Sequence, residues 1–220
     1  MKKLTYTIAL VILGTFVSCK NDKKSSDTEK TDVTTEKSSI TLDVSDRNIN
    51  NDRTYIISSD STNVSWTAYK TSSKIAVGGQ FTSIDFETSK GATIAEAFNN
   101  LEFTIPVSGL FTDNEDRDKK LIASFFDVML DTKDITGKLS FDKDDSCSAT
   151  ITMNGKSVKV PLAYFAAENE IIFTAELNLE DWDTTGALKT LNIACGELHK
   201  GEDGISKTWT EVAIKITTKY

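Results

Sequence analysis

From residue 63 onward, apolar residues recur at every second position of the chain. In one such segment Leu101, Phe103, Ile105 and Val107 alternate with polar or conformationally constrained residues. Successive side chains of a β-strand point to opposite faces, so this period predicts strands with one buried and one solvent-exposed face. The same period runs through residues 64–68, 75–81, 135–141, 149–153, 158–164, 171–179 and 212–216. We therefore expect about eight antiparallel strands.

Short turns connect the expected strands. Asn154 and Gly155 lie between two alternating segments and are a strong signal for a two-residue hairpin, whereas Glu168 and Asn169 are a weaker one. An open antiparallel sheet exposes unpaired edges, and closure into a barrel removes them. The interior of an eight-stranded barrel is either filled by its own side chains or holds one small ligand. The sequence predicts an all-β fold and leaves these two interiors open.

Three segments break the alternation and predict one to three short helices. These segments are residues 93–99, 117–129 and 180–199. The first begins with a capping box, in which Thr93 caps the helix and Glu96 follows three residues later. The second carries apolar residues at helical spacing, with Asp116 or Asp118 as its expected cap. The third is expected to combine helix and loop.

The first residues have the arrangement of a secretory signal peptide. Two lysines precede residues 4–17, which are uncharged, mostly apolar and too short to cross a bilayer. Ser18 precedes Cys19, as in the bacterial lipobox. We expect cleavage after residues 1–18 and acylation of Cys19, whose lipid chains would hold the protein at a membrane. The alternative is plain cleavage beside an incidental cysteine.

The remainder divides into a tether and one domain. Residues 19–53 contain serine, threonine and charged residues but almost no large apolar side chain. Such a segment cannot bury enough surface to offset chain entropy, so we expect it to be disordered. Residues 54–220 have the length of a single domain.

The formal net charge of −8 limits the partners of the protein. No basic stripe is available to displace counterions from phosphates, which argues against nucleic acid. The charge also argues against adhesion of the folded domain to anionic lipid head groups, and leaves the acyl chains on Cys19 as the membrane contact. We expect an exported protein of the cell envelope, at a membrane facing the periplasm or the cell surface.

Cysteine and histidine are scarce in the expected domain. Cys147 and Cys195 either form a disulfide in an oxidising compartment or remain two small buried residues. His199 is the single histidine, and with Cys195 it supplies too few ligands for a structural zinc site. Neither a glycine-rich phosphate loop nor a nucleophile beside a base is evident. We predict a protein that is not an enzyme and uses neither cofactor nor metal.

Several spaced motifs resemble one protein family. The segment DNEDRDKKLIASFFDVM is similar to an element of the YceI-like family of secreted lipid-binding barrels, matching at Arg117, Asp118, Leu121, Phe125, Phe126 and Asp127. VSWTAYKTSSKIAVGGQFTSID, residues 64–85, looks like the first hairpin of that family, with Val77, Gly79 and Phe81 in its spacing. ATITMNGKSVKVPL, residues 149–162, is similar to the central hairpin, and residues 191–216 resemble the C-terminal part of a lipoprotein branch.

The resemblance implies an eight-stranded antiparallel lipocalin-like β-barrel whose elongated cavity holds an apolar lipid such as a polyisoprenoid. Large inward residues are the candidates for contact with that lipid: Trp66, Phe81, Phe103, Ile105, Phe125, Phe126, Leu139, Phe141, Phe173 and Leu177. Lys70 stands where many relatives have a histidine. Lys70 and Arg117 are candidates either for contact with a lipid head group or for a structural role at the rim.

Two functions remain open at this stage. A mixture of rings and small residues on the inward faces fits a lipid cavity, and it also fits ordinary interdigitation in a filled core. In the first case the protein binds or carries a long apolar lipid. In the second it is a protein-interaction or envelope-stress module that acts through its acidic outer face or residues 180–204.

Overall fold

The computed structural model describes residues 54–220 of the chain. The expected signal peptide, the lipidation site Cys19 and the tether to residue 53 lie outside the described residues. Within residues 54–220, no helix has the length and the hydrophobicity that crossing a bilayer requires.

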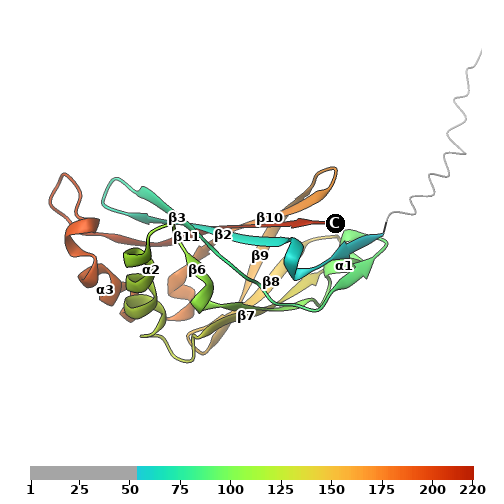
Figure 1. The fold of residues 1–220 in the computed structure, drawn as a ribbon, viewed down its shortest axis with the longest axis horizontal. Coiled ribbons are helices and arrows are strands. Elements are labelled where there is room, and N and C mark those ends of the chain that lie inside the picture. Colours follow the sequence, from blue (N-terminus) through green and yellow to red (C-terminus); the bar gives the residue numbers. More distant parts are fainter. Residues whose placement is uncertain (1–53) are drawn as a thin grey trace, which may run out of the picture. The chain divides into compact units, whose positions relative to one another are not determined.

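Nine strands form one antiparallel sheet in the order β5-β7-β8-β9-β10-β11-β2-β3-β6 (Figure 1). Their bounds are β2 (Thr62–Lys70), β3 (Ile75–Phe81), β5 (Glu102–Pro106), β6 (Leu110–Phe111), β7 (Asp134–Phe141), β8 (Cys147–Met153), β9 (Lys156–Ala166), β10 (Glu170–Asn178) and β11 (Thr208–Lys219). A separate pair joins β1 (Tyr55–Ile57) to β4 (Ser89–Gly91). Every alternating segment of the sequence overlaps a strand of the large sheet, and two of them extend by a residue or so beyond the strand ends.

The two edges of the large sheet come close to meeting. β5 and β6 are consecutive in the chain and are separated by the 3-10 turn η2 (Val107–Gly109). Backbone N–H groups of Thr82 and Asp85 donate to the carbonyl oxygens of Gly109 and Thr104 at 2.8 and 2.7 Å. The prediction of an antiparallel lipocalin-like barrel is therefore confirmed. Its strand count differs by one from the eight expected, because η2 divides residues 102–111 into two strands.

The predicted hairpin at Asn154 and Gly155 joins β8 to β9. Both residues have positive φ, 51° and 68°, as a two-residue type I′ turn requires. The Asn154 amide also donates to the carbonyl oxygen of Trp182 at 2.8 Å, and its side-chain oxygen accepts from the N–H of Leu130 at 2.8 Å. The turn therefore ties two neighbouring segments to the end of the barrel.

Three α-helices occur where the alternation breaks. They are α1 (Ile94–Phe98), α2 (Glu115–Leu121) and α3 (Thr185–Ala194). A π turn (Ile122–Phe126) extends α2, and further 3-10 turns are η1 (Ser59–Ser61), η4 (Leu179–Trp182) and η5 (Gly196–His199).

Two predicted details of helix capping are corrected by the structure. Thr93 caps α1 as expected, with its hydroxyl accepting from the N–H of Glu96 at 3.1 Å, but the Glu96 carboxylate accepts from Ala92 rather than from Thr93. The cap of α2 is Asn114, not an aspartate at 116 or 118. The chain turns at Asp113, which has a φ of 58°, so the helix starts earlier and the Asn114 oxygen meets the N–H of Arg117 at 2.9 Å.

Candidate ligand-binding cavity

The barrel encloses an apolar cavity. Its volume is about 190 Å³, measured as the space open to the centre of a water-sized sphere. By the same measure a single water needs roughly 10–15 Å³ and several polar partners. The cavity is therefore far larger than a packing defect, and its lining offers water few hydrogen-bonding partners.

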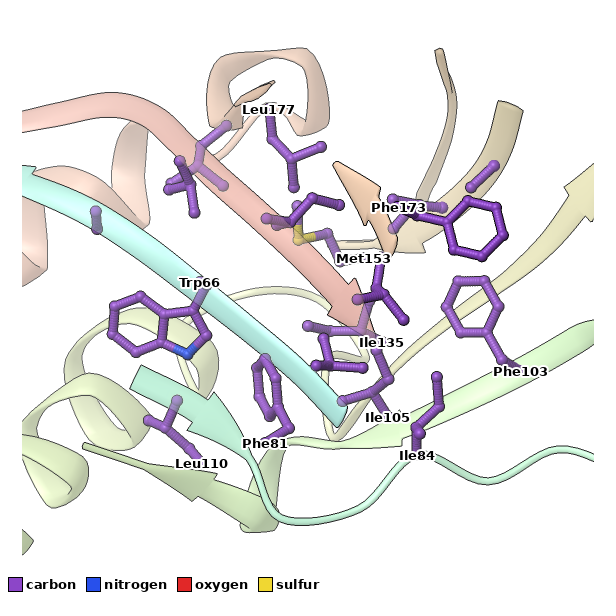
Figure 2. Close-up of a pocket in the computed structure, with 18 of the residues that line it drawn as sticks. Trp66, Phe81, Ile84, Phe103, Ile105, Leu110, Ile135, Met153, Phe173 and Leu177 are labelled. Atoms are coloured by element: carbon purple, nitrogen blue, oxygen red, sulfur yellow. The ribbon is translucent and has the colours of Figure 1, made fainter. Parts of the chain in front are cut away.

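The lining extends through the length of the barrel. It runs from Phe98 of α1 to Leu188 and Leu191 of α3, and Figure 1 shows these two helices at opposite ends of the sheet. Figure 2 shows side chains of strands and loops around the space between them, among them Trp66 and Phe173. An extended space with apolar walls suits a chain-like apolar molecule.

The structure brings together nine of the ten predicted lining residues. These are Trp66, Phe81, Phe103, Ile105, Phe125, Phe126, Leu139, Phe173 and Leu177. Phe141 does not line the cavity. Its ring packs instead against Tyr164, with ring centroids 5.4 Å apart, because it lies at the end of β7 where the chain leaves the barrel wall. Contact of the nine residues with a ligand remains a prediction.

Several lining residues were missed from the sequence. Phe98 lies in α1, Leu188 and Leu191 lie in α3, and Trp209 lies near the start of β11. The signal that was available is the helical spacing of Leu188 and Leu191, which places both on one face of α3. Nothing local to these residues indicates that this face covers a barrel rather than packing on another helix.

Glycines allow two of the lining rings to lie flat on the sheet. Gly79 pairs with Trp66 across β2 and β3, and Gly137 pairs with Phe103 across β5 and β7. A methyl group on Gly79 would overlap the Trp66 indole, and one on Gly137 would overlap the Phe103 ring. The small residues therefore seat the rings against the wall and keep them out of the centre of the cavity.

None of the described residues that line the cavity has an ionisable side chain. The hydroxyl groups of the lining are engaged with protein: Thr62 and Thr218 bond to each other at 3.0 Å. The Thr208 hydroxyl lies 2.7 Å from Nδ1 of His199 and donates to the Asn192 amide oxygen at 3.0 Å. This lining suits binding by burial and offers little for proton transfer.

The structure places the two predicted rim cations outside the lining. The Lys70 ammonium donates to the backbone carbonyl of Leu198 at 3.0 Å, which ties the end of β2 to η5. Arg117 lies in α2, four residues before Leu121, which does line the cavity. Within residues 54–220 the Arg117 Nε is buried and has no hydrogen-bond partner.

Cys147 and Cys195 are free and buried. The structure therefore has two separate buried thiols at these positions and not a disulfide. Cys147 begins β8, whereas Cys195 follows the C-terminus of α3. Burial raises the pKa of the Cys147 thiol to about 11. Burial also raises the pKa of Cys195, although Lys120 and Lys70 oppose that shift.

We expect both thiols to resist alkylation by iodoacetamide in the native protein at pH 8. The thiolate is the reactive form, and a raised pKa makes it scarce. Because the folded pKa of Cys147 lies above the ordinary value of 9.0, its contribution to stability is complete below pH 9 and is lost as the pH rises toward 11. Peptide mass spectrometry of the labelled protein measures how much of each thiol has been alkylated and so checks the expected resistance. Native Cys147 that reacts as fast as free cysteine would contradict it.

Cys195 and His199 stand four residues apart, and each has its own surroundings in the structure. Cys195 follows α3, and His199 lies in η5, where its ring Nδ1 is 2.7 Å from the Thr208 hydroxyl oxygen. Burial lowers the pKa of His199, and Lys70 lowers it further. Among residues 54–220, no three cysteine, histidine or carboxylate side chains gather as metal ligands would.

The YceI-like domain model matches residues 55–220 of the chain. The protein belongs to the YceI-like family. The family element at residues 113–129 forms α2 and the π turn, and its two phenylalanines line the cavity of this YceI-like barrel. No curated protein is significantly similar to the chain.

Three solved structures are similar to this YceI-like domain to different degrees. A polyisoprenoid binding domain from Saccharophagus degradans implicated in plant cell wall breakdown has a TM-score of 0.53 and 11% identity, over 75% of this chain and 98% of that chain. BcnA of Burkholderia cenocepacia has a TM-score of 0.49 and 15% identity, over 73% and 97% of the two chains. The YCEI protein of Campylobacter jejuni has a TM-score of 0.37 and 20% identity, over 61% and 83%. At 11% identity, the first likeness establishes a shared fold.

Proposed function

We propose that this YceI-like protein binds a long apolar lipid of the polyisoprenoid class inside its barrel. The observation that carries the proposal is the cavity, which extends from α1 to α3 and is lined by apolar side chains without an ionisable group. The S. degradans domain of the same fold is described as polyisoprenoid binding, which supports the choice of ligand class.

The affinity of such a ligand would come from burial. Apolar surface removed from water contributes about 25 cal/mol per Å², and association costs must be subtracted from that sum. Apart from the indole N–H of Trp66, which has no partner within residues 54–220, the few polar side-chain groups of the lining are bonded to protein. An apolar chain therefore leaves little polar surface unsatisfied. A lipid chain is accordingly a better occupant than a sugar, a peptide or a nucleotide.

We further propose that the protein is a lipoprotein of the cell envelope, anchored through acyl chains on Cys19. This part of the proposal rests on the sequence of residues 1–19. A flexible tether of about 30 residues averages on the order of 30 Å between its ends. The barrel would then stand off the membrane and exchange lipid with it or carry lipid away from it.

One measurement tests both parts of the proposal. Native mass spectrometry of the full chain, extracted from membranes of a Gram-negative host, is expected to show the protein carrying one prenyl lipid. Denaturation should release that lipid and leave the added mass of the acyl chains on the peptide that begins at Cys19. Bare protein that also fails to take up added prenyl lipid would contradict the binding function, and unmodified Cys19 would contradict the anchor.

The alternative, a protein-interaction or envelope-stress module, has one observation in its favour. Ile193, Leu198 and Ile205 are exposed within or next to the segment that contains α3 and η5, with exposed fractions of 72%, 59% and 57%. Exposed apolar side chains at one place can mark an interaction surface. A protein partner in envelope extract that is lost when these residues are replaced, with no lipid bound, would favour this function.

A further inference from the structure

Four large aliphatic side chains are exposed at the end of the barrel that carries α3. Ile193 lies in α3, Leu198 in η5 and Ile205 in the loop after η5, and Ile75 begins β3 with 51% of its surface exposed. Figure 1 shows α3, the segment after it and the β2–β3 hairpin together at the left end of the sheet. Single exposed aliphatic residues need no explanation, but several at one place can mark a contact surface. We refer to these four residues as the apolar tip.

Hydrogen bonds join the elements that carry the apolar tip. The N–H of Thr71 in the hairpin donates to the carbonyl oxygen of Lys207 at 2.9 Å, and Nε1 of Trp209 donates to the carbonyl oxygen of Thr71 at 2.7 Å. The loop after η5 is closed by a bond from the N–H of Gly201 to the carbonyl oxygen of Ile205 at 3.0 Å. The hairpin and the loop therefore form one unit that presents the four side chains together.

One end of the cavity borders the elements that carry the apolar tip. The cavity lining includes Leu191 of α3 and Trp209 at the start of β11. Ile75 lies on the same face of β3 as Phe81, which also lines the cavity, because an even number of positions separates them. A molecule that enters or leaves the barrel at the α3 end would therefore pass the apolar tip.

The charge at this end is opposite in sign to the charge of the chain. Residues 69–75 and 185–209 carry five lysines and three carboxylates, whereas the net charge of the chain is −8. The ammonium groups of Lys207 and Lys74 lie 3.4 and 4.8 Å from the ring centre of Trp209. Tryptophan and lysine are residues that suit the level of lipid head groups. The argument from net charge against contact with anionic lipid therefore does not apply to this end of the domain.

The length of chain before the domain allows this end to reach a membrane that holds Cys19. The described chain starts at the other end of the sheet, where β1 pairs with β4 and Gly91 lies against α1 (Figure 1). Residues 20–53 connect Cys19 to the domain, and a chain of that length spans on the order of 100 Å when extended. The twelve residues of β11 span roughly 40 Å. An anchor would also raise the local concentration of the domain at the bilayer, so a weak contact is sufficient.

We propose that the apolar tip docks on the surface of a lipid bilayer, with its four aliphatic side chains among the acyl chains and the neighbouring lysines at the head groups. Docking brings the α3 end of the cavity to the membrane, so that an apolar lipid passes between bilayer and barrel without crossing water. The passage of lipid rests on the proposed function, whereas the docking rests on the exposed side chains and the charge of this end.

The test measures the partition of the protein onto vesicles without help from acyl chains. It uses the chain from residue 19 onward with the substitution Cys19→Ser, and sucrose-loaded vesicles of equal parts phosphatidylethanolamine and phosphatidylglycerol. The protein is expected to sediment with the vesicles. The triple variant Ile193→Ser, Leu198→Ser, Ile205→Ser is expected to lower the partition coefficient by roughly tenfold or more, because interfacial affinity scales with the apolar area that is buried.

Two further variants separate docking from general effects of the substitutions. Phe165→Ser is the matched control, because Phe165 is 65% exposed on β9, outside the apolar tip, and its loss should leave the partition unchanged. Ile75→Ser alters the hairpin alone and leaves α3 and η5 intact, and it should lower the partition by about two- to fivefold. Thermal unfolding checks that each variant is folded, which the exposure of the replaced side chains favours.

The outcomes distinguish the docking from the other occupants of this surface and from the proposed function. Equal partition of the unsubstituted protein and the triple variant, or no partition of either, would overturn the inference. A dimer in lipid-free solution that the triple variant loses, or a protein partner from envelope extract in place of vesicle binding, would also overturn it. Squalene binding without vesicle binding removes the docking and leaves the proposed function. Vesicle binding without uptake of any prenyl lipid contradicts the proposed function and leaves the docking.

Discussion

Replacing Ala149 with phenylalanine is expected to lower the affinity for prenyl lipid by at least tenfold. Ala149 is 3% exposed on β8, and its small side chain is part of the cavity lining. A phenyl ring at this position points into the space that the lipid chain would occupy, so the ligand loses buried surface or is excluded. Titration of lipid-free protein with squalene, followed by calorimetry or native mass spectrometry, measures the loss.

Thr150→Phe is the matched control for this variant. Thr150 is the next residue of the same strand and is exposed, because successive side chains alternate between faces. The Thr150→Phe substitution adds the same ring on the outer face and should leave the affinity for prenyl lipid unchanged. Adding a larger side chain to a close-packed core lowers the free energy of unfolding by about 1–3 kcal/mol. Because Ala149 borders an open cavity, the loss of stability in Ala149→Phe should lie within or below this range. Full lipid binding by the folded Ala149→Phe variant would show that the lipid binds elsewhere.

Replacing Trp182 with alanine is expected to cause the largest loss of stability, about 3–5 kcal/mol. Trp182 ends η4 and is completely buried, and its Nε1 donates to the carbonyl of Ile151 in β8. Its own carbonyl accepts from the Asn154 amide at the β8–β9 turn. The substitution leaves a large void and removes the hydrogen bond to the Ile151 carbonyl, so a fall in Tm of roughly 10 °C or more is expected. Urea and thermal unfolding measure both quantities.

Trp209→Ala is the comparison for Trp182→Ala. The two substitutions remove the same side chain and the same kind of N–H bond to a backbone carbonyl, but Trp209 is only half-buried. Its loss should therefore cost clearly less. Equal losses of stability at the two positions would mean that complete burial is not what makes Trp182 contribute to the free energy of unfolding.

Much of the barrel could be predicted because its information is local. The alternation in residues 171–179 is enough to predict β10, since Phe173 and Leu177 can be buried together only on an extended chain with a period of two. The Asn154-Gly155 turn is equally local, because few residues tolerate two consecutive positive φ angles. The inward strand residues follow from the same period, and this explains seven of the nine predicted residues that border the cavity; the other two, Phe125 and Phe126, lie in the π turn after α2.

The errors occur where distant segments meet. The cap of α2 depends on the turn at Asp113, which the helical pattern of the following residues does not contain. Phe141 has the correct period for an inward residue, but the end of β7 places its ring on Tyr164. The pairing of Cys147 and Cys195 is not among these errors, because the sequence leaves both alternatives open. Pairing depends on the distance between β8 and the end of α3, and no spacing in the sequence encodes that distance.

The sequence by itself determined the strands, the buried face of each strand and the main hairpin, because each of these follows from the preferences of a few neighbouring residues. Only the tertiary structure decided that the barrel has free space inside it and that α1 and α3 border the two ends of that space. It also decided that Trp66 and Arg117 have buried donors without partners among residues 54–220. Free volume and hydrogen-bond satisfaction are sums over side chains from many strands. Such sums are fixed when the sheet closes, and a residue's own neighbours along the chain do not set them.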